Sequence, residues 1–449
     1  MNVPVKASET LPWHLQGNWA PVMDELDAGP LIIVGELPRA LNGDYVRAGM
    51  NPKSGHSEHW FAGSGMLHAV RLADGRATYK NRFVRTPYYE KDLDIMSGMF
   101  DPAASPANTN IVRHAGKWLA LEEAHLPWSV DRDLNTLEAH TFGGRLNGPM
   151  TAHPRVCPET GELLFFGYQL AAPPFLTYYR ADAQGVLVEA EPIEIPRPVM
   201  MHDWNITRNH VVFMDLPIVF DLSAAMRGEA PFGFKPEAGA RLGVMKRNAA
   251  GGAVRWFDID PCYVFHPVNA YEEGSRIVLH VCRQNSAMTG GLADIYGGAN
   301  TVDRLWRWTI DLDAGTVTEE QLDDAACDFP RVDDRRVGLK TRWGYTTSLD
   351  EGASSLTLGR RLHKYDLANG ARTSHDFGGG NHLGEPLFVP RPDAKAEDDG
   401  WILAFRHDEA ADQSRLVILN ADDFDGASQA EIIMPRRVPY GAHGNWMAA

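Results

Sequence analysis

Short β-prone runs followed by turn-forming residues fill the chain from residue 31 onward, and this pattern favours an all-β fold. Each run is four to eight residues long, the length of a sheet strand. Asp74-Gly75 and Ala314-Gly315 stand between such runs and predict hairpin turns. Long helical periodicity is rare, and Ala224–Arg227 predicts one short helical turn. The clearest β-prone runs are Leu31–Gly35, Trp118–Leu121, Glu162–Gly167, Val211–Met214, Arg276–Val281, Trp306–Ile310 and Leu416–Leu419.

The length of the chain favours one large propeller. A chain of 449 residues corresponds to about three domains of average size, but single all-β domains exceed that average. Seven blades of roughly 60 residues account for the length. We therefore predict a seven-bladed β-propeller, although no repeated motif sets the blade count. Residues 1–30 are expected to form an N-terminal arm, and residues 31–449 a single propeller domain.

The composition excludes several classes of partner. A net charge of -16 argues against nucleic acid, because phosphate binding requires a basic surface. The same charge disfavours electrostatic adhesion to anionic lipid. No apolar run approaches the ~20 residues of a membrane-spanning helix, and residues 1–10 lack a secretion signal pattern. Neutral or apolar small molecules remain as ligands, and the composition predicts no oligomeric state.

The cysteines indicate a reducing compartment. The chain has four of them, scattered and without a C-x-x-C pair. We therefore expect neither a disulfide framework nor a thiolate zinc site, and we predict a cytoplasmic protein. The four are Cys157, Cys262, Cys282 and Cys327.

Four of the 17 histidines have small or apolar neighbours rather than the charged neighbours of a solvated loop. They are His153, His202, His266 and His443. A single histidine is more often a surface or hydrogen-bonded core residue than a ligand, and these four are too far apart for a helical metal motif. Their shared setting nevertheless suggests that they converge on one metal ion. Imidazole suits iron, zinc and copper alike, so histidine alone does not name the metal.

Ordered motifs across nearly the whole chain resemble those of the carotenoid cleavage oxygenases. The resemblance implies a seven-bladed β-propeller that holds Fe(II) on its axis, beneath a cap of loops and short helices. It also implies that His153, His202, His266 and His443 bind this iron without a coordinated protein carboxylate. The motifs surround all four histidines and recur at Asn42–Pro52, His59–His68, Tyr79–Thr86, Ala107–Asn110, Asn269–Gly274 and Gly384–Arg391.

The resemblance further implies that three carboxylates orient the imidazoles, because a ligating histidine needs its other nitrogen held. Glu123 and Glu385 match two family glutamates. The third glutamate is replaced by Asp328, in Asp328-Phe329-Pro330-Arg331. Aspartate is one methylene shorter, so we expect it to reach its histidine through water or by a backbone shift. The chain also has Ala62 and Ser64 where the family's glycine-rich turn carries aspartates.

The implied activity is oxidative cleavage of an alkene. A non-haem Fe(II) dioxygenase of this kind uses O₂ to split a C=C bond of a carotenoid or apocarotenoid into two carbonyl products. Thr109 matches a family threonine beside a vacant iron position. Phe61 is a candidate lining residue of the aromatic, apolar tunnel that such a substrate requires.

The stilbene-cleaving branch of the family is the alternative. That branch binds the phenol of its substrate with a tyrosine and a lysine. Here Glu122 occupies the place of the lysine, and Phe100 aligns with the tyrosine. A glutamate repels a phenolate, so we expect a carotenoid or apocarotenoid rather than a stilbene or phenylpropenoid. Glu122 would no longer argue against a stilbene if its side chain turned outward or accepted a hydrogen bond from a substrate hydroxyl group.

Other kinds of function remain as competing hypotheses. A 2-His-1-carboxylate iron oxygenase uses an H-x-[DE] pair, which occurs at His56-Ser57-Glu58 and at His407-Asp408-Glu409. A propeller can also serve as a non-enzymatic platform for protein partners, with its histidines buried for packing. Peripheral membrane contact is a further hypothesis, which rests on the apolar runs Ala171–Leu176 and Pro231–Phe234.

Overall fold

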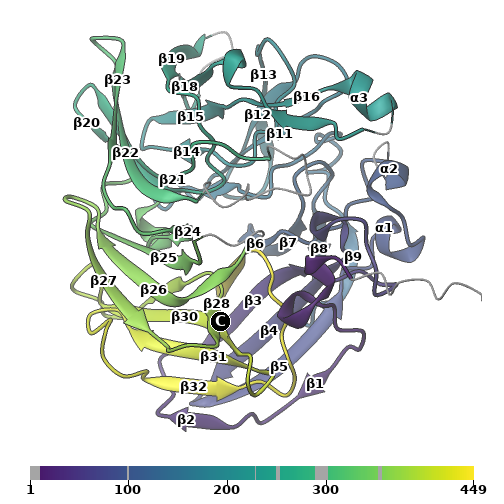
Figure 1. Ribbon diagram of the computed structural model, residues 1–449, viewed down its shortest axis with the longest axis vertical. Helices are drawn as coiled ribbons and strands as arrows, with labels where there is room; N and C mark the ends of the chain where they lie inside the picture. The colour runs from purple at the N-terminus through teal and green to yellow at the C-terminus, as the bar shows by residue number, and fades with distance from the viewer. Residues whose placement is uncertain (1–10, 99–100, 228, 249–252, 289–301, 352–355) are drawn as a thin grey trace, which may run out of the picture.

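The computed structural model describes residues 11–98, 101–227, 229–248, 253–288, 302–351 and 356–449. Among these residues, seven antiparallel sheets stand around a central axis as the blades of a propeller (Figure 1). The predicted all-β, seven-bladed fold is therefore confirmed. Each β-prone run singled out in the sequence overlaps a strand, and Ala224–Arg227 overlaps a short helix.

Three consecutive blades follow the first one along the chain, each with four strands in sequence order from the axis outward. The second blade has β6 (Asn110–His114), β7 (Lys117–Leu121), β8 (Trp128–Val130) and β9 (Thr136–Ala139). The third has β10 (Arg155–Val156), β11 (Leu163–Tyr168), β12 (Leu176–Ala181) and β13 (Leu187–Ile193). The fourth has β14 (Asn205–Ile206), β15 (His210–Asp215), β18 (Ala240–Lys246) and β19 (Arg255–Ile259).

The next two blades repeat this arrangement. The fifth has β20 (Pro267–Glu273), β21 (Arg276–Arg283), β22 (Arg304–Asp311) and β23 (Thr316–Gln321). The sixth has β24 (Cys327–Arg331), β25 (Trp343–Leu349), β26 (Leu358–Asp366) and β27 (Ala371–Asp376).

The two ends of the chain close the ring by exchanging strands. β33 (Gly444–Ala448), the last strand, pairs with β3 (Gly43–Met50) and becomes the inner strand of the first blade, beside β4 (Gly65–Ala73), β5 (Arg76–Phe83) and β1 (Asp27–Ala28). β2 (Ile33–Gly35) pairs in turn with β32 (Ala430–Ile433) of the seventh blade, whose other strands are β28 (Asn381–Leu383), β29 (Leu387–Pro390), β30 (Gly400–Asp408) and β31 (Gln413–Asn420).

The core lies between the blades rather than within a single layer. Strands in the middle of a blade are buried on both faces, as in the eight buried residues of β3, whereas β5 alternates buried and more exposed positions. One buried cluster joins Val46 and Leu67 of the first blade to Ile111 and Ala120 of the second. The turn at Asp74-Gly75 takes positive φ at both residues, 53° and 73°, as a tight hairpin requires.

Short helices lie in the N-terminal arm and in the loops that connect the strands. They are α1 (Pro87–Glu90), α2 (Ile95–Gly98), α3 (Leu222–Met226) and the 3-10 turns η1 (Trp13–Leu15), η2 (Gly17–Trp19), η3 (Trp60–Ala62), η4 (Pro236–Ala238) and η7 (Asp334–Arg336). A two-stranded ribbon of β16 (Ile218–Phe220) and β17 (Phe232–Phe234) lies near α3 (Figure 1). Tyr88 of α1 donates a hydrogen bond of 2.7 Å to the carbonyl of Ala62, which ties α1 to η3. Among the described residues, none of these helices has the length and apolar character needed to cross a membrane.

Candidate metal centre

The four histidines singled out in the sequence occupy equivalent places in four blades. His153 lies two residues before β10, and His202 three residues before β14. His266 and His443 directly precede β20 and β33. All four therefore stand where the chain enters the innermost strand of a blade. Because inner strands surround the axis, this repeated position brings four distant segments to one end of it.

The four imidazoles converge. One donor nitrogen from each lies within 4.8 Å of the others, and all four residues are buried. The Nε2 atoms of His153 and His202 are 3.0 Å apart. Nε2 of His266 is buried without a hydrogen-bond partner. A buried polar atom without a partner is costly, so this inward-facing lone pair indicates that a further group belongs at the centre.

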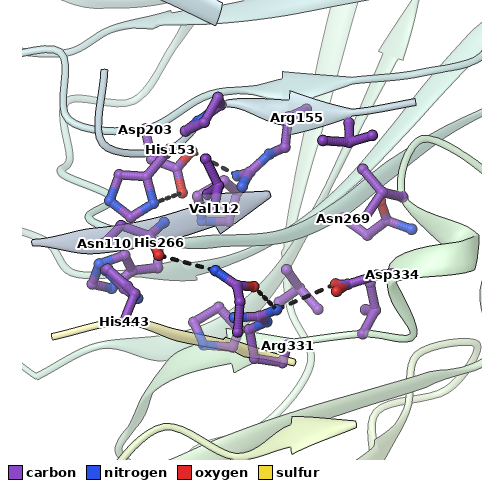
Figure 2. Close-up of a pocket in the computed structure, with 18 of the residues that line it drawn as sticks. Asn110, Val112, His153, Arg155, Asp203, His266, Asn269, Arg331, Asp334 and His443 are labelled. Carbon is purple, nitrogen blue, oxygen red and sulfur yellow. Dashed lines mark hydrogen bonds and ion pairs between the residues drawn. The ribbon is translucent and has the colours of Figure 1, made fainter. Parts of the chain in front are cut away.

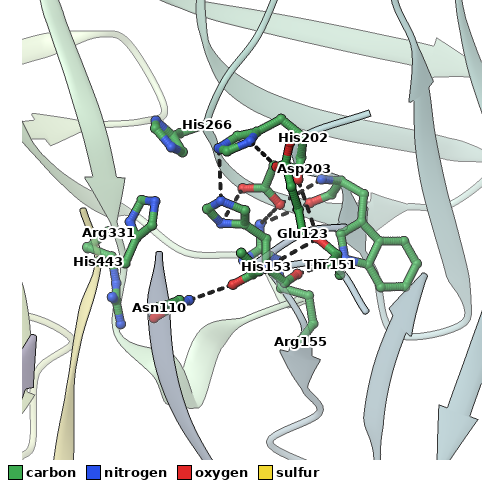
Figure 3. Close-up of polar contacts among 12 residues, drawn as sticks. Asn110, Glu123, Thr151, His153, Arg155, His202, Asp203, His266, Arg331 and His443 are labelled. Carbon is green, nitrogen blue, oxygen red and sulfur yellow. Dashed lines mark hydrogen bonds and ion pairs between the residues drawn. The ribbon is translucent and has the colours of Figure 1, made fainter. Parts of the chain in front are cut away.

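Carboxylates hold the outer nitrogens of three imidazoles. Nδ1 of His202 lies 2.5 Å from Glu123 Oε2, and Nδ1 of His443 lies 2.9 Å from Glu385 Oε1. His266 contacts both oxygens of Asp328, at 2.9 and 3.0 Å. A carboxylate at Nδ1 keeps the proton there and leaves Nε2 as a lone pair for a metal. Figure 3 shows Glu123 beside His202 and the other imidazoles around it.

Burial keeps much of the cluster uncharged. Burial, together with the three neighbouring imidazoles and Arg155, places the pKa of His153 well below its ordinary value. Burial also lowers the pKa of His443, against the opposing effect of Glu385. For His202, burial lowers the pKa, but Glu123 outweighs it and the net pKa is raised. A ligating imidazole must be neutral, so the environment of His153 and His443 suits metal binding at neutral pH.

Glu385 is also held through its second oxygen. Its Oε2 accepts hydrogen bonds from the Gly444 amide at 2.9 Å and from Arg331 Nη1 at 3.2 Å. Burial alone would raise the pKa of Glu385, but Arg331 and His443 outweigh burial and bring this pKa to about 2. Glu385 therefore carries a full negative charge beside His443.

The charges around the four imidazoles fit a divalent cation. Four carboxylates approach the imidazoles, and two arginines pair with two of those carboxylates. Buried charges are stable only when they are balanced, and an ion of charge +2 would balance the remaining two. Four nitrogen donors without a coordinated carboxylate suit iron, zinc or copper. The carboxylates are Glu123, Asp203, Asp328 and Glu385, and the arginines are Arg155 and Arg331.

A cavity of about 440 Å³, lined by both polar and apolar residues, leads to this cluster along the axis. It is lined by residues of the inner strands, among them Asn110, Arg155 and Asn269, and it reaches His153 and His443 (Figure 2). Its mixed lining differs from the aromatic, apolar tunnel expected from the sequence, and Phe61 does not line it. The apolar tunnel therefore stays a prediction.

Comparisons with known proteins agree with this geometry. The family model described as RPE65, retinal pigment epithelial membrane protein, matches residues 19–448. The carotenoid 9,10(9',10')-cleavage dioxygenase of Crocus sativus is 35% identical, over 96% of this chain and 88% of that protein. The carotenoid cleavage oxygenase of Mycobacterium tuberculosis is 34% identical, over 98% of both chains.

The chain belongs to the carotenoid cleavage oxygenase family.

Solved structures of this family superpose closely on the propeller. Lignostilbene dioxygenase of Pseudomonas brassicacearum has a TM-score of 0.90 at 27% identity, over 98% of this chain and all of that one. Cobalt-substituted apocarotenoid oxygenase of Synechocystis has a TM-score of 0.85 at 27% identity, over 96% of this chain and 97% of that one.

Of the two routes expected from the sequence, water or a backbone shift, Asp328 reaches its histidine by the backbone shift. It contacts His266 directly, by means of a backbone irregularity in β24, where the register with β25 shifts between Asp328 and Arg331. Phe329, within this irregularity, has a φ of 54°, which is rare for a bulky residue. Its ring packs 5.1 Å from that of His266. In this member of the family, a local backbone shift thus compensates for the shorter acid.

The remaining predicted site residues lie near the cluster or outside the described residues. Thr109 directly precedes β6, and its carbonyl accepts a hydrogen bond of 3.0 Å from the His443 amide. Phe61 is half-buried in η3 and packs on two core clusters. Glu122 does not turn outward, because its Oε2 lies 2.7 Å from Nδ1 of His125. Phe100 lies outside the described residues.

Several residues beside the cluster were missed in the sequence. Asp203 directly follows a predicted ligand, and its Oδ2 lies 3.3 Å from Nδ1 of His153. Tyr168 donates a hydrogen bond of 2.6 Å to Glu123. Arg155 and Arg331 hold Asp203 and Glu385. The adjacency of Asp203 to His202 was the one available signal; the other contacts arise between blades.

The competing motifs do not contribute to this centre. Among the residues the structure describes, the group of histidines, cysteines and acids that could hold a metal ion contains neither His56 nor His407. His407 Nε2 lies instead 3.7 Å from Asp412. The apolar run Ala171–Leu176 is exposed over its first four residues, and Pro231–Phe234 is half-buried. Membrane contact by these runs stays a prediction.

Proposed function

We propose that this protein is a ferrous-iron dioxygenase that cleaves one C=C bond of a carotenoid or apocarotenoid into two carbonyl products. The observation that carries the proposal is the convergence of four buried imidazoles on one point, with the outer nitrogens of three of them held by acids. The similarity to carotenoid-cleaving dioxygenases of Crocus sativus and other organisms supports the substrate class. In the reaction, both atoms of O₂ end in the two carbonyl groups.

The iron would be held by His153, His202, His266 and His443. The carboxylates of Glu123, Asp328 and Glu385 would hold the Nδ1 protons of three of these histidines, so that the Nε2 lone pairs face the iron. Ferrous iron would supply the ability to activate O₂ toward an electron-rich alkene. The residues of the chain bind and orient the alkene and exclude water. No side chain has to transfer a proton, since two carbonyl groups form without one. Thr109 would restrict what binds beside the iron.

Cleavage of a stilbene or phenylpropenoid is the second candidate. The close superposition on the lignostilbene dioxygenase of Pseudomonas brassicacearum favours it. Against it stands Glu122, which lies beside His125 and would oppose a phenolate. We also propose a reducing cytoplasm as the location, which the free state of all four cysteines supports.

Iron content and product analysis test the proposal. We expect the protein, reconstituted with Fe(II) under anaerobic conditions, to bind one iron and to form two carbonyl products, identified by mass spectrometry. The substrates to be tested are carotenoids, apocarotenoids, hydroxystilbenes and propenyl phenols. His202→Ala should lose iron and the cleavage of every substrate, because a site with only three of its four imidazoles binds iron weakly.

His56→Ala is the matched control, since His56 is exposed and outside the cluster, and it should keep both properties. A folded wild-type protein that binds no metal would contradict the proposal and would favour the protein-binding platform. Cleavage of hydroxystilbenes alone would favour the second candidate.

A further inference from the structure

The fourth imidazole, that of His153, has a carboxylate of its own. Oδ2 of Asp203 lies 3.3 Å from Nδ1 of His153. Both side chains are buried, with 4% and 3% exposure. Figures 2 and 3 show Asp203 between His153 and Arg155. Among the described residues, the three carboxylates predicted from the sequence pair instead with His202, His266 and His443.

Asp203 is itself held in place from its other side. Its Oδ1 accepts hydrogen bonds of 2.6 Å from Arg155 Nη2 and from the Trp204 amide. The indole of Trp204 in turn donates to the carbonyl of His153 at 2.9 Å. The segment that carries His202 as a ligand therefore also carries the acid for His153, and the two segments are joined by several hydrogen bonds.

We propose that Asp203 is a positioning residue that holds the Nδ1 proton of His153 and so directs its Nε2 lone pair at the metal. This inference rests on the proposed function. It gives each of the four imidazoles one carboxylate, so that the site is built from four matched pairs rather than from three pairs and one unsupported histidine. An acid in this place fixes the tautomer of a ligand, and its loss typically lowers metal affinity about 10- to 100-fold.

The asparagine variant has a distinctive expected effect. Arg155 and the Trp204 amide are both donors, so the amide oxygen of Asp203→Asn must face them. Its NH₂ group then faces Nδ1 of His153 and favours the tautomer with the proton on Nε2, which cannot bind a metal. Asp203→Ala removes the carboxylate without imposing this tautomer. We therefore expect metal affinity to fall in the order wild type, Asp203→Ala, Asp203→Asn.

A purely structural role predicts the opposite order for the two variants. Asparagine keeps the size and the hydrogen bonds to Arg155, whereas alanine leaves a gap and an unpaired arginine. The thermal stability of the metal-free proteins should follow that opposite order. The two orders can be measured on the same samples.

The test uses Co(II) alone as the probe, in titrations of the metal-free full-length protein followed by visible absorption. We expect Asp203→Asn to lower the Co(II) affinity about 10- to 100-fold and to change the absorption bands. Asp215→Asn is the matched control, because Asp215 is equally buried and paired with Arg241 at 2.8 Å, away from the cluster. It should bind Co(II) as the wild type does.

Each outcome has one meaning. If the wild type binds no Co(II), the proposed function fails and this inference with it. If the wild type binds Co(II) and Asp203→Asn binds it equally well, or if affinity follows the stability of the metal-free variants, only this inference is overturned. If Asp203→Asn does not fold, Arg155→Gln and its control Arg241→Gln decide: equal Co(II) affinities of these two variants overturn the inference.

Discussion

At the scale of single residues, the centre depends on side-chain lengths that match the local backbone. Asp328 is fully buried and contacts His266 with both oxygens. It does so because β24 departs from regular pairing at this point. Such a departure commonly re-aims a side chain beside a functional site. The irregular backbone of β24 and the short side chain of Asp328 therefore depend on each other. We expect a change in either one to disturb the contact with His266.

Asp328→Glu should for this reason weaken the site, although glutamate is the residue that the resemblance to the family led us to expect. An additional methylene in a fully buried position costs about 1–3 kcal/mol and displaces the carboxylate from His266. Thermal unfolding and Co(II) titration measure the two effects. Asp324→Glu, at an exposed position, should change neither; an Asp328→Glu protein that binds Co(II) as well as the wild type would refute the argument.

At the scale of elements, the N-terminal arm supports the segment that ends in a predicted ligand. The ring of Trp19 in η2 lies 4.9 Å from the rings of both Trp60 and Tyr440. The carbonyl of Asn18 accepts a hydrogen bond of 2.9 Å from the Tyr440 amide. Tyr440 stands three residues before His443, and Trp60 belongs to η3, which carries Phe61. The arm thus contacts both segments at once.

Trp19→Ala should lower the stability of the protein by about 2 kcal/mol, since Trp19 is half-buried and a fully buried tryptophan contributes about 3–5 kcal/mol. The gap beside Tyr440 should also loosen His443. Differential scanning fluorimetry with and without Co(II) measures both effects. Met23→Ala, at a residue of the arm with 53% exposure, should behave as the wild type. Equal melting temperatures for the two variants would show that the arm contributes no stability.

At the scale of the whole molecule, a metal at the centre would connect four of the seven blades. The histidines precede the inner strands of the first, third, fourth and fifth blades. The ring is otherwise closed by β33 in the first blade and β2 in the seventh. A ligand that binds only the folded state stabilises it by mass action. Metal binding is therefore expected to stabilise the whole propeller and not one blade.

Removal of the metal with a chelator should lower the melting temperature of the wild type. A free metal concentration 100 times the dissociation constant corresponds to about 2.7 kcal/mol of stabilisation. The same chelator should have no effect on His153→Ala, whose site is incomplete, and should destabilise His56→Ala as much as the wild type. A chelator effect of equal size in His153→Ala would place the stabilising metal elsewhere.

The sequence by itself determined the strands and the ligand candidates. Short apolar runs bounded by turn residues have few folds open to them, and His153, His202, His266 and His443 stood out by their neighbours and by the resemblance. Only the tertiary structure placed Asp203 beside His153 and Asp328 beside His266. The direction of a short carboxylate depends on local backbone geometry and on partners such as Arg155 that come from another segment. No pattern along a single strand encodes those contacts, because they exist only once the blades pack around the axis.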